Sequence, residues 1–138
     1  AGAKAAMESL AVSRSYELTR FGIETSIVVP GAFTRGTDHF PSAGKPADVA
    51  RSDAYARYDG VMDKVGERLS DLTPEEADPQ AVADDIVRIV GLPQGSRPAR
   101  SVIDFVGDGA AEVLEVSERV RIDFAKRVGI EDLISVNP

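Results

Sequence analysis

The sequence predicts an α/β protein, and three observations support this. Two short apolar segments, residues 23–29 and 101–106, have the composition of strands in a parallel sheet. Segments with apolar residues at helical spacing surround them, at residues 1–21, 52–69, 78–91 and 110–128. The order helix, strand, two helices, strand, helix suits a right-handed crossover between parallel strands. With a length of 138 residues, the chain is expected to form a single domain.

The first helix has one apolar stripe and ends at a glycine. The stripe consists of Ala3, Met7, Leu10, Ala11, Leu18 and Phe21. Gly22 can adopt the left-handed conformation that ends helices without a Cβ clash. The strand that follows is continuously apolar from residue 27 to residue 29, as expected for a strand buried on both faces. Pro30 lacks an N–H group, so the strand is predicted to stop there.

The middle of the chain is predicted to be irregular and then helical. Residues 32–47 are rich in Gly, Pro, Thr and Ser, which indicates a loop. The helix at 52–69 has its apolar residues on one face, and residues 71–76 form a linker.

The last two helices have clear end signals. Asp78 is predicted to cap the third helix, with Pro79 in the first helical position and Gly91 at its end. Its predicted buried stripe comprises Val82, Ile86, Ile89 and Val90. The last helix has a stripe of Val113, Val116, Val120, Phe124 and Val128, and it ends before Gly129.

Composition excludes several classes of function. A net charge of −7 disfavours binding to nucleic-acid phosphates. The absence of cysteine excludes disulfides and thiolate sites. No apolar stretch approaches the roughly 18 residues of a membrane span, so no membrane partner is expected. A single histidine, His39, is expected neither to form a metal site nor to act as a catalytic base.

One family resemblance is carried by the order of four features near the start of the chain. A helix with Lys4 in its first turn, a glycine, an apolar strand and Pro30-Gly31 resemble the second half of a classical short-chain dehydrogenase/reductase. Lys4 matches the lysine of that family's Tyr-x-x-x-Lys motif, which places the tyrosine just before residue 1. The resemblance implies the C-terminal part of a Rossmann-like doubly wound parallel sheet. The missing N-terminal half of the domain is then expected upstream, with its glycine-rich turn, serine and tyrosine.

The resemblance also implies a cofactor site. Lys4 would lower the pKa of the tyrosine phenol and donate to the ribose of NAD or NADP, two cofactors that this sequence does not distinguish. The turn after the strand would hold the nicotinamide through Pro30, Gly31, Ala32, Phe33, Thr34 and Thr37. The family's threonine falls where this chain has Arg35, so Thr34 and Thr37 remain alternatives for that role.

The region 32–72 is expected to cover a small carbonyl or alcohol substrate, with Arg35, Tyr55, Tyr58 and Met62 lining the pocket. The protein is then a fragment of an NAD(P)-dependent oxidoreductase of the cytoplasm, and the isolated chain is expected to lack activity. The alternative is a non-catalytic, self-associating module. Both hypotheses predict a homo-oligomer, because the first helix is apolar and a two-stranded sheet leaves an open edge.

Overall fold

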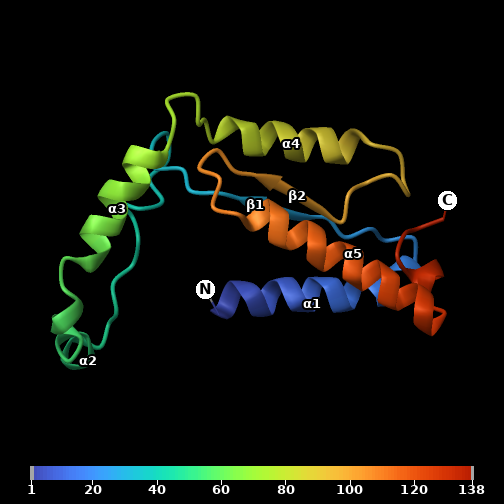
Figure 1. Cartoon of the computed structure of the whole chain (residues 1–138), viewed down its shortest axis with the longest axis horizontal. Coiled ribbons are helices and arrows are strands. Elements are labelled where there is room, and N and C mark those ends of the chain that lie inside the picture. Colours follow the sequence, from blue (N-terminus) through green and yellow to red (C-terminus); the bar gives the residue numbers. More distant parts are fainter. Residues whose placement is uncertain (1, 138) are drawn as a thin grey trace.

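The computed structural model describes residues 2–137 and has a mixed α/β fold, as predicted (Figure 1). Its elements are α1 (Gly2–Thr19), β1 (Ile27–Pro30), α2 (Val49–Asp53), the 3₁₀ helix η1 (Ala56–Tyr58), α3 (Val61–Leu72), α4 (Gln80–Gly91), β2 (Arg100–Ile103), α5 (Ala110–Val128) and the 3₁₀ helix η2 (Glu131–Leu133). The short η2 was not expected from the sequence.

The two strands pair in parallel, which confirms the predicted pairing. Ile27 lies opposite Arg100 and Pro30 opposite Ile103. The Gly31 N–H donates to the Ile103 carbonyl at 2.9 Å, so the ladder continues one step past β1. Both strands are shorter than predicted.

Side chains explain the shortened strands. Before β1, Glu24 pairs with Arg97 at 2.9 Å and accepts from the Gly95 N–H at 2.8 Å, so side-chain contacts replace a ladder there. After β2, the Asp104 carboxylate binds the backbone of the following turn. The strand therefore ends three residues earlier than its apolar composition indicated.

Helices cover both faces of the sheet (Figure 1). Helix α4 lies on one face, while α1 and α5 lie on the other. Among residues 2–137 the buried side chains are few: Phe33, Thr73, Ala77, Ile89, Ala125 and Val136.

The predicted single helix at 52–69 was wrong. Gly60 has φ of +76°, a left-handed conformation that breaks the helical path, and α2, η1 and α3 replace the single helix. We call residues 49–72 the arm. It extends away from the sheet and its helices (Figure 1), and all of its residues except Leu69 are exposed.

The helix ends were predicted well. The Gln80 N–H donates to Asp78 Oδ1 at 2.8 Å, and Pro79 already has helical backbone angles. Gly22 and Gly129 both have left-handed conformations just past their helices. No helix in the described range 2–137 combines the length and apolar character needed to cross a membrane.

The predicted stripe of α4 is buried only in part, and the predicted stripe of α5 is not the buried face. In α4 only Ile89 is buried, while Val90 is exposed. In α5 the whole predicted stripe is exposed, and Leu114, Ile122 and Ala125 turn inward instead. Glu118 and Arg121 share that inward side, where they pair with each other. Ion pairs therefore take up part of the space that the pattern assigned to apolar packing.

Candidate functional site

An open groove of about 550 Å³ runs between α1 and β1. It is lined by Lys4, Met7, Glu8, Ala11 and residues 25–30. Lys4 and Pro30 were predicted to be site residues from two separate motifs, and the fold brings both to this groove. Within residues 2–137, β1 pairs with β2 alone, so its other edge is unpaired.

Lys4 is the cationic group of the groove. It lies in the first turn of α1, and Glu8 lies one turn further along. Glu8 is bound by Arg100 Nε at 2.9 Å, and the side chain of Arg100 is only 10 % exposed. Glu8 therefore pairs with Arg100 of β2 rather than with Lys4, although residues four apart on a helix can pair.

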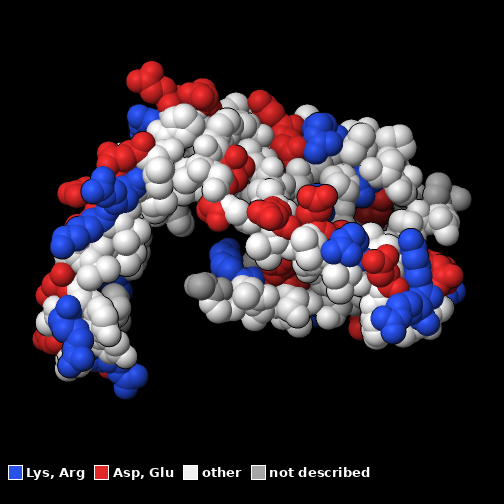
Figure 2. All heavy atoms as spheres, in the orientation of Figure 1, with Lys and Arg blue, Asp and Glu red and all other residues white. Residues whose placement is uncertain are grey.

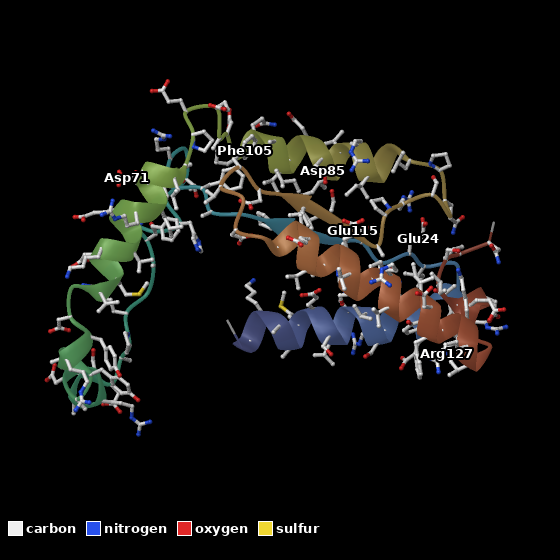
Figure 3. The ribbon with its side chains drawn as sticks, viewed as in Figure 1. Glu24, Asp71, Asp85, Phe105, Glu115 and Arg127 are labelled. Atoms are coloured by element: carbon white, nitrogen blue, oxygen red, sulfur yellow. The ribbon has the colours of Figure 1, made fainter. Side chains whose placement is uncertain are left out.

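The turn after β1 packs against the residues that follow β2 at the end of the sheet. Phe33 is buried and packs edge-to-face on Phe105, with ring centroids 5.9 Å apart (Figure 3). Gly31 lies against Asp104. Aromatic packing and this close contact fix the backbone of the turn at the carboxyl end of the sheet, where α/β proteins bind ligands.

Asp104 is a residue that the sequence reasoning placed inside a strand and gave no role. Its carboxylate accepts from the N–H groups of Val106, Gly107 and Asp108 at 2.9–3.0 Å. Burial opposes its ionisation, but these backbone donors outweigh burial and hold the pKa of Asp104 below its ordinary value. An aspartate followed by Gly107 and Gly109 was the available signal for such a turn.

The two candidate threonines differ in their hydrogen bonding. Thr37 Oγ1 accepts from the His39 N–H at 3.2 Å and so belongs to a local turn. Thr34 Oγ1 is buried and has no hydrogen-bond partner within the described residues. A buried hydroxyl without a partner is costly in a folded protein and is a group that a ligand can satisfy.

Arg35 binds backbone rather than an open pocket. Its Nη2 donates to the carbonyls of Thr73 and Pro74 at 2.7 and 2.9 Å. Thr73 is itself buried and directly follows the arm. Arg35 therefore ties the loop after β1 to the segment between α3 and α4.

The other predicted substrate residues are not brought to the groove. Tyr55, Tyr58 and Met62 are exposed on the arm. The rings of Tyr55 and Tyr58 lie 6.3 Å apart, and open space separates the arm from α1 (Figure 2). His39 is exposed in the loop and stacks edge-to-face on Phe40.

An ionic cluster joins α1, β2 and α5 beneath the groove. Arg100 binds Glu8 of α1 and Glu118 of α5, and Arg121 also binds Glu118. The Arg121 guanidinium lies 5.2 Å from the ring centroid of Tyr16. Bonding to Arg121 holds the pKa of Glu118 below its ordinary value, and bonding to Glu118 raises the pKa of Arg121. The Arg100–Glu8 pair spans 92 positions, so no local pattern could reveal it.

The groove and turn together offer a limited chemistry. They supply the Lys4 ammonium group, the Thr34 hydroxyl and the backbone of a turn after a strand. Those groups can bind a polar ligand through its hydroxyl or amide groups. In the described part of the chain, no cluster of three His, Cys, Asp or Glu residues is arranged to hold a metal ion. No protein-family model and no curated protein matches this chain.

Proposed function

We propose that this chain is the cofactor-binding C-terminal part of an NAD(P)-dependent short-chain dehydrogenase/reductase that interconverts a carbonyl and an alcohol. The observation that carries the proposal is the groove that Lys4 and Pro30 both line. Residues 26 positions apart, drawn from two motifs of that family, meet at one site next to a free strand edge.

Lys4 and Thr34 are assigned separate roles. The Lys4 ammonium binds the ribose hydroxyls and lowers the pKa of a neighbouring tyrosine phenol, which then can act as acid and base near neutral pH. The unpartnered Thr34 hydroxyl favours Thr34 over Thr37 as the residue that binds the nicotinamide carboxamide. The bound nicotinamide would supply or accept the hydride.

The fold that this proposal requires is a Rossmann-like doubly wound sheet. Helices already flank both faces of β1 and β2, as in such folds (Figure 1). The edge of β1 that is unpaired within residues 2–137 is the place where a further parallel strand, from an upstream segment of the same protein, would pair. That segment would carry the tyrosine and the pyrophosphate-binding turn and would complete the groove.

The test uses the full-length gene product, assayed for oxidation of NADH and NADPH with a panel of small ketones and aldehydes. Lys4→Met is expected to lower kcat by about 100-fold or more, the usual contribution of acid–base machinery. Lys45→Met, in the exposed loop before the arm, is the matched control and is expected to leave turnover unchanged. The proposal fails if no carbonyl is reduced with either cofactor, or if the two variants behave alike.

A second candidate function is a non-catalytic, self-associating module. The exposed residues of the α1 stripe favour it, since Met7 and Leu10 are 61 % and 62 % exposed. Replacing Leu10 with Lys would then abolish association without any effect on nucleotide binding. Carbonyl reduction by the full-length gene product would favour the oxidoreductase over the self-associating module.

A further inference from the structure

The chain contains two Asp-Gly dipeptides, Asp59-Gly60 and Asp108-Gly109. In such a dipeptide the aspartate side chain reacts readily with the amide that follows it, because glycine has no Cβ to hinder the approach. Both dipeptides stand directly before a helix, and both glycines have left-handed backbones, with φ of +76° and +88°. Both aspartates are exposed. The two sites are therefore a matched pair, and they differ in what holds each aspartate in place.

Asp59 is weakly held. It lies in the arm, between η1 and α3, and its N–H donates to the Ala56 carbonyl at 3.0 Å. Among residues 2–137, its carboxylate takes part in no hydrogen bond or ion pair, and the Gly60 N–H has no acceptor. A Cβ on Gly60 would meet nothing within 4 Å, so open space surrounds that residue. Within the described part of the chain, neither of the two reacting groups is engaged elsewhere.

Asp108 is held through both its backbone and its side chain. The N–H groups of Gly107 and Asp108 both donate to Asp104 Oδ2 at 2.9 Å. Asp108 Oδ1 in turn accepts from the Ala110 N–H at 2.7 Å, at the start of α5. To reach the nitrogen of Gly109, the Asp108 carboxyl group would first have to give up this hydrogen bond.

We propose that Asp59 is a site of spontaneous isomerisation to isoaspartate, and that the turn around Asp108 protects the second dipeptide. The Gly60 nitrogen forms a bond to Cγ of Asp59, and the Cγ–OH bond breaks. The amide proton and the hydroxyl group leave together as one water molecule, which closes a succinimide ring. Water then opens the ring at one of its two carbonyl groups. Opening at the side-chain carbonyl restores aspartate, and opening at the main-chain carbonyl gives isoaspartate.

The product changes the main chain of the arm. In isoaspartate the main chain runs through Cβ, so it gains one atom between η1 and α3. The change falls directly before the first turn of α3, where the Gly60 carbonyl accepts from the Lys64 N–H at 3.2 Å. The ladder of β1 and β2 and the ionic cluster lie outside the arm, so the sheet should stay unchanged. This reaction does not depend on the proposed oxidoreductase activity.

The test incubates the whole chain in water enriched in the heavy oxygen isotope, in a mildly acidic buffer that favours loss of water from the carboxyl group. Each ring opening adds one heavy oxygen atom, which mass spectrometry detects. Trypsin separates the two sites into peptides 58–64 and 101–119. Asp59 is expected to gain label at least about tenfold faster than Asp108, since a hydrogen bond to a charged group stabilises the closed arrangement by about that factor. Electron-transfer fragmentation then identifies isoaspartate at residue 59.

Two controls attribute the difference to the structure. In concentrated urea both dipeptides should gain label at similar rates, because the hydrogen bonds around Asp108 are then lost. Asp104→Ala, checked for folding by circular dichroism, should raise labelling at Asp108 and leave labelling at Asp59 unchanged. Equal labelling of the two aspartates in the folded chain would overturn the proposal, as would a folded chain without isoaspartate at residue 59. A difference that persists in urea would show that the turn does not protect Asp108.

Discussion

Gly31 and Asp104 touch at the carboxyl end of the two strands. A Cβ on Gly31 would lie 2.3 Å from Asp104 Oδ1 and 2.9 Å from Asp104 Cβ. The Asp104 carboxylate cannot easily retreat, because three backbone N–H groups bind it. The glycine after Pro30 is therefore required by the fold itself, in addition to any ligand that its turn holds.

Replacing Gly31 with alanine is expected to destabilise the protein by about 1–3 kcal/mol, the usual cost of inserting a methyl group into filled space. Urea unfolding measures this change in the free energy of unfolding. Gly66→Ala is the control, since Gly66 lies in helix α3 with nothing within 4 Å and should tolerate alanine. In an Asp104→Ala background the cost of Gly31→Ala should fall but not vanish, because alanine removes the carboxylate and keeps the Cβ 2.9 Å away. An undiminished cost there would show that another neighbour opposes the methyl group.

Replacing Arg100 with methionine is expected to cost about 2–3 kcal/mol, because it leaves the carboxylates of Glu8 and Glu118 without a shared, largely buried partner. Arg20→Met removes an exposed pair with Asp132 and should cost less than about 1 kcal/mol. Thermal unfolding of the two variants compares them directly. Equal losses would mean that the ionic cluster contributes no more than a surface pair.

The pH dependence of stability provides a test of Glu118. Its pKa lies below the ordinary value of 4.5 in the folded protein, chiefly through bonding to Arg121. The folded state therefore binds its proton less readily than the unfolded state. The stabilisation by the carboxylate is complete above pH 4.5 and declines as the pH falls through the lower, folded pKa.

For Glu118→Gln, the loss of stability relative to wild type should accordingly be largest at neutral pH and should shrink below about pH 4.5. Urea unfolding at pH 7 and pH 3 measures both values. A difference that stays constant between these pH values would contradict the assignment.

Replacing Arg35 with alanine removes two hydrogen bonds to the carbonyls of Thr73 and Pro74. The amides of residues 73 and 75–77 should then exchange about tenfold faster, which corresponds to the loss of roughly one such interaction. Hydrogen exchange followed by mass spectrometry detects this change. Arg57→Ala, on the exposed η1, is the control and should leave those amides unaffected. If both variants exchange alike, Arg35 does not tie the arm to the body.

Local chemistry made parts of the fold predictable. The cap at Asp78 and the glycines that end α1 and α5 act through their own backbone, so the sequence reveals them. The parallel pairing of β1 and β2 also followed from the order of elements. The break at Gly60 was missed because an isolated glycine is often tolerated inside a helix.

Contacts between distant segments could not be predicted from the sequence in the same way. The spacing of the α5 stripe was correct, but spacing does not tell which side of a helix meets the sheet. Lys4 and Pro30 were predicted from motifs, and their meeting in one groove is a tertiary property. The roles of Asp104 and Arg100 depend on Gly31 and Glu8, which lie far away in the sequence.

The exposed arm has a consequence for the covalent integrity of the chain. It connects a first part, which contains β1 and Phe33, to a second part, which contains β2 and Phe105. Those parts are held to each other by the ladder, by the aromatic pair and by the ionic cluster, none of which passes through the arm. If a protease cut the arm, the two resulting fragments would thus stay associated as one non-covalent complex, with the groove and the turn still assembled.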